Sequence, residues 1–154
     1  MSNIKNILLN KISCKSIWFM RQAGRYLPEF REIRSKNQDF IKLCLNPDLS
    51  TEITLQPLRR FNFDAAIIFS DILMLPYGLD QNVEFKKDFG PILGQLDLNK
   101  IFKVKEIDFV KRVKQVYEAI KNVSNNHILK NKNTIGFVGA PWTTLVYMIN
   151  QQSP

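Results

Sequence analysis

The sequence predicts an α/β fold built from parallel strands. Three short apolar runs, at residues 16–20, 65–69 and 134–139, have the length and the β-branched or aromatic content of buried strands. Each run is followed by residues with helical spacing, and this alternation of strand and helix is typical of βαβ units. No internal repeat, low-complexity tract or evident linker interrupts the 154 residues, so we expect a single domain.

The N-terminal part is predicted to place a strand between two helices. Ile4, Leu8 and Ile12 recur at spacings of four, which indicates a short helix or arm over the first 13 residues. SIWFM (16–20) is an apolar run that ends at the polar RQAGR, so we expect a buried strand that leads into a functional loop. Pro28 suits the first position of the next helix, and the following glutamate suits its first turn.

The middle of the chain is predicted to hold a long helix and the most strongly apolar strand. Asn46 has the side chain of an N-cap, and Pro47 directly after it suits the first position of a helix over residues 46–61. A kink is expected near Pro57, because proline cannot donate the helical hydrogen bond. AAIIF (65–69) follows as the best candidate for a buried strand.

The remaining elements are a hairpin, an amphipathic helix, a third strand and a last helix. Residues 81–93 alternate and carry a Gly-Pro pair, which favours an excursion or a small hairpin. Residues 104–122 have apolar side chains at helical spacing with lysines on the other face. TIGFVG (134–139) is the third strand, and Pro141 stands near the start of the helix after it. The apolar face of the amphipathic helix comprises Val104, Ile107, Val110, Val113, Val116, Tyr117 and Ile120.

The charge pattern indicates an acidic partner for the N-terminal part. The formal net charge is +8, and the first 36 residues carry eight Lys and Arg against two Glu, a net +6. Arg21, Arg25, Arg31 and Arg34 fall within 14 residues. Nucleic acid is one partner that such a surface suits, and a small polycarboxylate paired with the arginines is another.

Composition excludes several classes of protein. No stretch reaches the roughly 18 to 20 consecutive apolar residues of a membrane helix, and the N-terminus is too polar for a secretory signal. We therefore expect a cytoplasmic protein with no membrane partner, in which Cys14 and Cys44 are reduced thiols. His127 is the only histidine and lies in an Asn-rich loop, so no zinc-ligand spacing occurs and a Cys/His catalytic pair has no local signature. The glycines match no phosphate-binding motif, and no metal or cofactor is expected.

Asp71 and the RQAGR loop are the candidate functional features. Asp71 ends the apolar run AAIIFS, where α/β proteins bind ligands, although an aspartate there is equally suited to cap the next helix. Beside several arginines its carboxylate would remain ionised and could accept hydrogen bonds from ligand N–H groups. Arg21 and Arg25 directly follow a predicted strand, and Gly24 permits close backbone approach, which favours a ligand site over an exposed basic loop. Trp142 and Tyr147 are expected to be packing aromatics.

Three long motifs, in order, carry a resemblance to a known family. WFMRQAGRYLPEFRE, TLQPLRRFNFDAAIIFSDIL and GFVGAPWTTLVYM together resemble uroporphyrinogen decarboxylase, from about Ile17 through Ile149. The resemblance implies a (β/α)₈ TIM barrel and a cofactor-free cytoplasmic homodimer. Its substrate is uroporphyrinogen, a tetrapyrrole whose four acetates become methyls with release of four CO₂, and whose eight carboxylates require a basic cleft.

The resemblance also implies roles for individual residues. Arg21, Gln22, Ala23, Gly24 and Arg25 would line the cleft, with Arg21 and Arg25 pairing substrate carboxylates. Arg34 matches a further binding arginine, Asp71 matches the aspartate that gathers the pyrrole N–H groups, and Tyr147 matches a substrate-contacting tyrosine. Arg21 is also a proposed proton donor of the family, although arginine is so weak an acid that it is better suited to clamp a carboxylate.

The chain departs from the family in length. A barrel needs roughly 250 residues, and residues 1–154 hold about three of the eight strands, which makes this a single incomplete domain, the N-terminal part of the barrel. The family's later serine and C-terminal histidine lie outside these residues. We expect the isolated chain to be unstable or aggregated and inactive, unless a separate C-terminal fragment completes it. It would then be a fragment of a split gene, of a decayed gene or of a sequence that was cut. The alternatives are a corrinoid-linked methyltransferase relative and a basic nucleic-acid-binding module.

Overall fold

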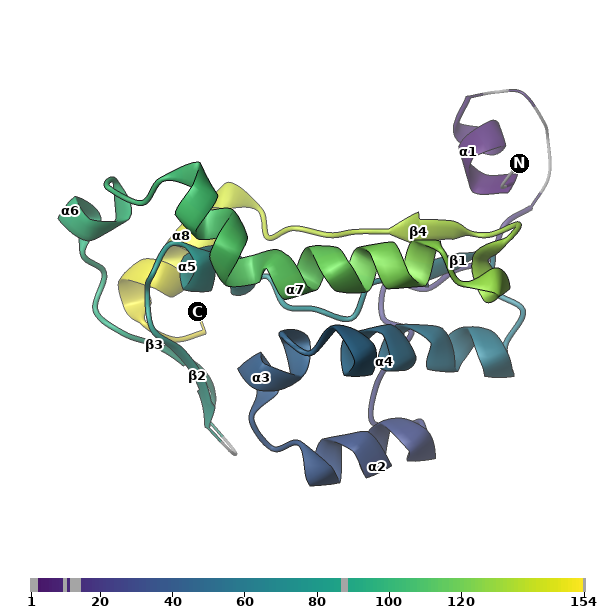
Figure 1. Ribbon diagram of the computed structural model, residues 1–154, viewed down its shortest axis with the longest axis horizontal. Helices are drawn as coiled ribbons and strands as arrows, with labels where there is room; N and C mark the ends of the chain where they lie inside the picture. The colour runs from purple at the N-terminus through teal and green to yellow at the C-terminus, as the bar shows by residue number, and fades with distance from the viewer. Residues whose placement is uncertain (1–2, 10, 12–14, 87–88, 154) are drawn as a thin grey trace.

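A computed structural model describes residues 3–9, 11, 15–86 and 89–153. Two strands, β1 (Ala65–Ile67) and β4 (Asn133–Ile135), pair in parallel, with Ala65 opposite Asn133. Two long helices, α4 (Pro47–Arg60) and α7 (Glu106–Ser124), pack against each other and contact these strands (Figure 1). A parallel pair joined through intervening helices is the βαβ arrangement that the sequence predicts.

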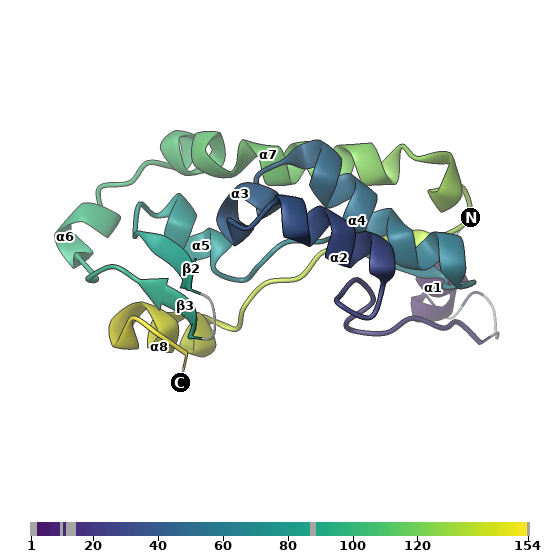
Figure 2. The same cartoon turned by 90° about the horizontal axis from the view of Figure 1, so that it is seen from below.

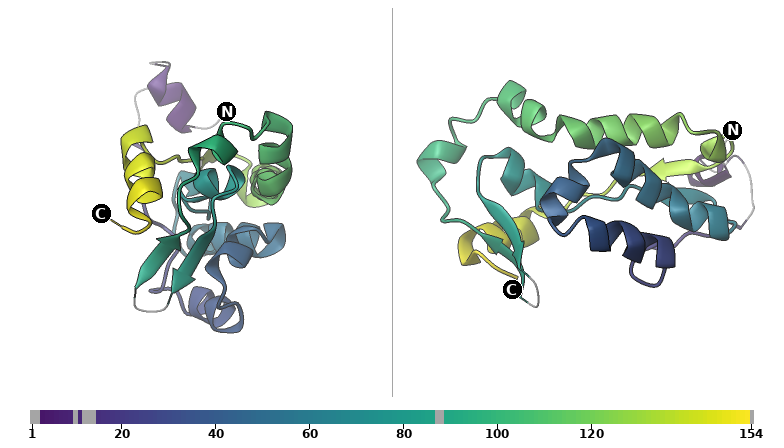
Figure 3. Two further views of the ribbon diagram at one scale, coloured as in Figure 1. Left: turned by 90° about the vertical axis from the view of Figure 1, so that its left-hand side faces the viewer. Right: turned by 60° about the horizontal axis from the view of Figure 1, so that its bottom comes forward.

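Shorter elements complete the chain at the two ends of this unit. Helix α1 (Asn3–Leu8) lies near β4 at one end, whereas the hairpin and the helices α5, α6 and α8 gather at the other (Figures 1 and 2). Helix α2 lies on the side of α4 that faces away from α7 (Figures 1 and 3). The bounds are α2 Pro28–Lys36, α3 Phe40–Cys44, α5 Met74–Gly78, β2 Val83–Lys86, β3 Gly90–Leu93, α6 Leu98–Ile101, η1 His127–Leu129 and α8 Pro141–Asn150.

The helix starts follow the sequence signals closely. The Asn46 side chain accepts a hydrogen bond from the Leu49 N–H at 3.0 Å, so it caps α4 as predicted. Pro28 and Pro141 stand at the first turns of α2 and α8, where their missing N–H groups have no helical partner to lose. Pro57 lies inside α4, as predicted, and the expected kink there stays a prediction.

The predicted strand at residues 16–20 is wrong for this chain. Ile17, Trp18, Phe19 and Met20 are irregular and have 42% to 79% of their surface exposed. The backbone is tied to Asp64, the residue before β1: the Asp64 N–H donates to the Ile17 carbonyl at 2.9 Å, and the Ile17 N–H donates to the Asp64 carboxylate at 2.7 Å. The apolar side chains stay largely exposed, although the Phe19 ring meets that of Phe63 edge to face. A run of apolar residues forms a buried strand only when neighbours bury it on both faces. The parallel sheet therefore has two strands here rather than three.

The third predicted strand is shorter than expected. Residues 134–135 belong to β4, but Gly136 through Gly139 are irregular, and Phe137 and Val138 are exposed. The open side of β4 has no partner strand among the described residues, so pairing stops early. The predicted hairpin is confirmed, since β2 and β3 pair antiparallel with Val83 opposite Leu93.

Helix α7 is amphipathic, and its predicted face is confirmed only in part: Val113 is buried, and Val116 and Ile120 pack against the core clusters. Val113 is buried and departs from helical geometry, with φ −110° and ψ 15°. Ile107 and Tyr117 are exposed, whereas Ala119 and Val123 are fully buried against α4 and β1. The local bend at Val113 turns the two halves of the helix relative to each other, so one straight 3.6-residue stripe does not describe its buried face. Ile12 and Cys14, both named in the sequence predictions, lie outside the described residues.

Candidate functional site

The RQAGR loop is fixed to β1 by the side chain of Gln22. This amide is only 3% exposed; its Nε2 donates to the Ala65 carbonyl at 3.0 Å, and its Oε1 accepts from the Phe19 N–H at 3.0 Å. The side chain thus fills a position on the edge of β1 that a neighbouring strand would occupy. The loop that follows is held against the strand even though residues 16–20 do not pair with it.

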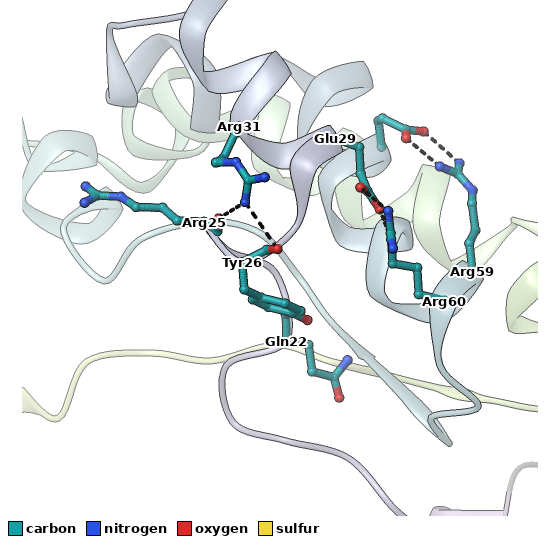
Figure 4. A network of polar contacts seen from close by, with 8 residues as sticks. Gln22, Arg25, Tyr26, Glu29, Arg31, Arg59 and Arg60 are labelled. Atoms are coloured by element: carbon teal, nitrogen blue, oxygen red, sulfur yellow. Dashed lines mark hydrogen bonds and ion pairs between the residues drawn. The ribbon is translucent and has the colours of Figure 1, made fainter.

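Further hydrogen bonds close the loop on itself. The Tyr26 hydroxyl donates to the Gln22 carbonyl, and the Arg31 guanidinium donates to the carbonyls of Arg25 and Tyr26, at 2.7 and 3.3 Å (Figure 4). Arg31, counted among the basic residues of the sequence, therefore has a structural role in holding the loop. Burial raises the pKa of Tyr26, and the charge of Glu29 adds to this.

Arg21 and Arg25 are the free cations of this loop. Both are exposed, and in the described part of the chain neither guanidinium forms an ion pair. Figure 4 shows the Arg25 side chain extending away from the hydrogen-bonded groups around it. Both therefore remain able to pair with a ligand carboxylate.

Two other arginines nearby are already neutralised. Arg60 pairs with Glu29 through two hydrogen bonds of 2.6 and 2.9 Å, and Arg59 pairs with Glu52, one of the bonds being 2.7 Å (Figure 4). These bonds lower the pKa of both glutamates and raise the pKa of both arginines. The Arg60–Glu29 pair also joins α2 to α4, so it supports the helix that begins directly after the loop.

Ala23 and Gly24 complete the loop with different environments. Ala23 packs against an apolar cluster formed by Leu27, Phe30, Leu43 and Ile53. A Cβ atom built on Gly24 would meet only the Tyr26 ring, at 3.8 Å, so nothing within the described chain requires a glycine there. Its predicted role in close approach to a ligand stays a prediction.

Asp71 lies four residues after β1 and three before α5. Its Oδ1 accepts from the Leu73 N–H at 2.8 Å, which forms a turn before α5, whose N-cap residue is Leu73. Asp71 is therefore near the helix start without being the cap itself. Burial raises the pKa of its carboxyl, and the Leu73 hydrogen bond opposes this rise. An adjacent arginine would instead lower the pKa of this carboxyl.

Arg34 is held at the end of α2. Its guanidinium donates to the Asn37 carbonyl and lies 5.6 Å from the centre of the Phe40 ring. Cys44, which is fully buried and free, is affected by the charges of both Arg34 and Asp71. Burial, followed by the charge of Asp71, raises the pKa of the Cys44 thiol, whereas Arg34 lowers it. The two charged groups thus both act on one thiol, an effect that no pattern in the sequence indicates.

Phe69 connects the loop to this second group. It contacts the apolar cluster on which Ala23 packs and also the larger cluster that contains Cys44, Leu73 and Met148. Its ring meets Phe30 and Phe40 edge to face, with centres 5.9 and 5.8 Å apart. Because Phe69 precedes Asp71 by two residues, packing around it links the position of the carboxyl to that of the RQAGR loop.

Tyr147 joins the site from α8. It is partly buried against the cluster of Leu73, Met74 and Met148, and its hydroxyl lies 3.4 Å from that of Ser153. The expectation that Trp142 is a packing aromatic is wrong here, because 76% of its surface is exposed. The exposure of Trp142 could not be predicted from the sequence, because the residues around an aromatic side chain do not show which element it packs against.

Other sites are not formed in the described parts of the chain. Among residues 3–9, 11, 15–86 and 89–153, His, Cys, Asp and Glu do not gather in groups of three or more that could hold a metal ion. Within the same residues no helix combines the length and the apolar character needed to cross a membrane.

The fold and these side chains define an α/β protein in which a basic loop is anchored at the first residue of a parallel strand and a partly buried carboxyl follows the same strand. Residues 9–154 match the family model described as Uroporphyrinogen decarboxylase (URO-D), and the chain belongs to this family. It corresponds to the N-terminal portion of the family sequence. The sequence-based resemblance is therefore confirmed.

Named relatives agree with the family match. Proteins named uroporphyrinogen decarboxylase from Brucella ovis, Brucella canis and Brucella melitensis are each 49% identical to the chain over 134 residues. The match covers 86% of this chain and 39% of each relative. The chain thus spans well under half the length of these relatives.

Proposed function

We propose that this chain supplies the N-terminal wall of a uroporphyrinogen decarboxylase cleft. The observation that carries the proposal is the buried hydrogen bond between Gln22 and Ala65, since it fixes the RQAGR loop to the strand that leads to Asp71. In this proposal the loop presents its two unpaired guanidinium groups to the same cleft that Asp71 faces. A substrate with eight carboxylates and four pyrrole N–H groups needs both kinds of partner.

In this proposal Arg21 and Arg25 bind substrate carboxylates, together with Arg34. Each guanidinium can form two parallel hydrogen bonds with one carboxylate, which fixes orientation as well as charge. Gln22, Ala23 and Gly24 shape the loop, and Gly24 leaves room for the substrate beside the backbone. Tyr147 contributes one wall from α8.

Asp71 is proposed to stabilise the cation that the reaction forms. A ring carbon of the pyrrole takes a proton, and the acetate then loses CO₂ and leaves its electron pair in the ring system. The exocyclic methylene takes a second proton to become the methyl group, and the ring carbon releases the first proton, which restores the pyrrole. Each acetate thus consumes one proton and releases one CO₂. A carboxylate fixed beside the ring N–H groups lowers the energy of the cationic ring, and loss of such a group typically costs on the order of 10²- to 10³-fold in rate. We assign Arg21 to carboxylate binding rather than to proton donation, because a guanidinium group is a very weak acid.

The chemistry requires the rest of the family sequence. We propose that the remaining strands and helices cover the exposed apolar residues beside β1 and β4, and that the complete barrel works in the cytoplasm as a homodimer without a cofactor. The exposed set comprises Ile17, Trp18, Phe19, Met20, Phe137, Val138, Trp142, Leu145 and Ile149. So much exposed apolar surface is unusual for a monomeric protein and marks a surface that other structure covers.

Complementation tests this proposal. The 154-residue chain is mixed with the part of the Brucella ovis relative that lies outside the match, and coproporphyrinogen formation is measured by chromatography. We expect steady turnover from the mixture and none from either part alone. The Asp71→Asn variant should lose turnover, whereas Asp48→Asn, which removes an exposed carboxylate in the first turn of α4, should keep it. Equal turnover of both variants would contradict the role of Asp71.

A further inference from the structure

A second basic site lies at the corner between α6 and α7, at the end of the molecule away from α1 (Figure 1). A pocket of about 540 Å³ is present there, a volume within the range of small-molecule sites. Its lining comprises Lys100, Lys103, Val104, Asp108, Lys111 and Arg112. Four of the six side chains are cationic, so the pocket concentrates positive charge from two helices and the segment between them.

Two of these cations are held in place by one carboxylate behind the pocket. Asp80 accepts from Lys100 Nζ at 2.7 Å and from Arg112 Nη1 at 2.6 Å. Its backbone is left-handed, with φ 69°, a conformation that aspartate tolerates better than most residues in a turn. The hydrogen bond from Lys100, and then the charge of Arg112, lower the pKa of Asp80. The carboxylate therefore stays charged and fixes both cations at the pocket wall.

The other two cations are free to meet a ligand. Lys103 and Lys111 are exposed, and across the described residues neither has an ion-pair partner. Counting Asp108 in the lining and Asp80 behind it, four positive side chains face two negative ones, which leaves a net charge of +2. A pocket with a net charge of +2 attracts an anion that carries more than one negative charge.

We propose that the α6–α7 pocket binds a compact multivalent anion, a phosphate ester or pyrophosphate-like group. The cations converge on one hollow, whereas a nucleic acid needs a basic stripe that follows its backbone, with aromatic side chains for stacking. Val104 is the apolar residue of the lining, and no aromatic ring contributes to it. The site is separate in the chain from Asp71, because α5 lies between Asp71 and Asp80. It does not rest on the proposed decarboxylase function.

Equilibrium dialysis with radiolabelled pyrophosphate tests this proposal on the full 154-residue chain. We expect saturable binding at one site, and about tenfold weaker binding by the double variant Lys103→Gln/Lys111→Gln, since two charge-assisted contacts are lost. The matched control is Lys121→Gln/Lys130→Gln, which removes the same charge from exposed positions near the other end of α7. The control should bind within about twofold of the parent, because salt screens charges at that distance.

The dialysis results distinguish binding in the α6–α7 pocket from binding that depends only on the net positive charge of the chain. Equal weakening of both double variants, with unchanged circular dichroism, would show that net charge and not the pocket binds the anion, and would overturn the proposal. Binding of single-stranded RNA that competes with pyrophosphate and depends more steeply on salt would also overturn it, in favour of nucleic acid. Non-saturable binding of pyrophosphate by the parent chain would also overturn the proposal.

Discussion

The anchoring of the RQAGR loop by Gln22 makes a quantitative prediction. The variant Gln22→Met keeps the length and apolar stem of the side chain but removes both of its hydrogen bonds. The Ala65 carbonyl lies in a buried position, and the cost of an unsatisfied buried acceptor is about 1–3 kcal/mol. Phe19 is itself exposed, so its N–H can form a hydrogen bond with water in the variant. Loss of its bond to Gln22 therefore costs only about 0.5 kcal/mol more.

We therefore expect Gln22→Met to lose about 1.5–3.5 kcal/mol of unfolding free energy. In urea unfolding followed by circular dichroism, the midpoint should fall by about 0.5 M or more, given slopes of about 1–3 kcal/mol per M for small proteins. Gln95→Met, at an exposed glutamine, is the matched control and should change stability by less than about 0.5 kcal/mol. If the two variants have the same midpoint, the anchoring role assigned to Gln22 is wrong.

Three further predictions concern packing and ionisation. A Cβ at residue 78 would come within 2.4 Å of the Phe109 ring, so Gly78→Ala should cost about 1–3 kcal/mol in the same unfolding assay, whereas Gly136→Ala, where nothing lies within 4 Å, should be nearly neutral. The raised pKa of Asp71 means that its contribution to stability is present below the ordinary value of 3.8 and is lost as pH rises through the raised value. Asp71→Asn should accordingly gain stability over the parent at neutral pH and match it in strong acid; a variant less stable at neutral pH would show that burial does not disfavour the charge. In a Cys14→Ser background, the buried Cys44 thiol should react with a disulfide reagent only in denaturant, and rapid reaction of the folded chain would contradict its burial.

Local signals in the sequence were enough to predict most helices and the hairpin. Asn46 with Pro47, Pro28 and Pro141 each marked a helix start that the structure confirms, because capping depends on residues close in the chain. The run at residues 16–20 has the composition of a strand, but its conformation depends on neighbours that the described chain does not provide. The face of α7 was predicted only in part for a related reason, since the bend at Val113 has no signature in the spacing of apolar residues.

The candidate site could be predicted in part. The RQAGR loop and Asp71 stood out because charged groups followed apolar runs, and the family resemblance assigned their residues. The structural role of Gln22 could not be inferred, since a glutamine in a loop is ordinarily exposed and its partner Ala65 is 43 residues away. Cys44 was likewise invisible as a neighbour of both Asp71 and Arg34, because three separate elements bring these residues together.

The central claim is that the unpaired arginines of the RQAGR loop, and not basic charge in general, bind the carboxylates of the substrate. The direct measurement is kcat/KM for uroporphyrinogen in the complemented enzyme, for Arg21→Gln/Arg25→Gln and for Arg59→Gln/Arg60→Gln. Both variants lose two positive charges, but the second pair is already neutralised by Glu52 and Glu29. We expect the loop variant to lose about 100-fold or more in kcat/KM, with each lost bidentate contact costing about 1.5–3 kcal/mol, and the paired-arginine variant to lose under about fivefold. Equal losses in the two variants would contradict the claim.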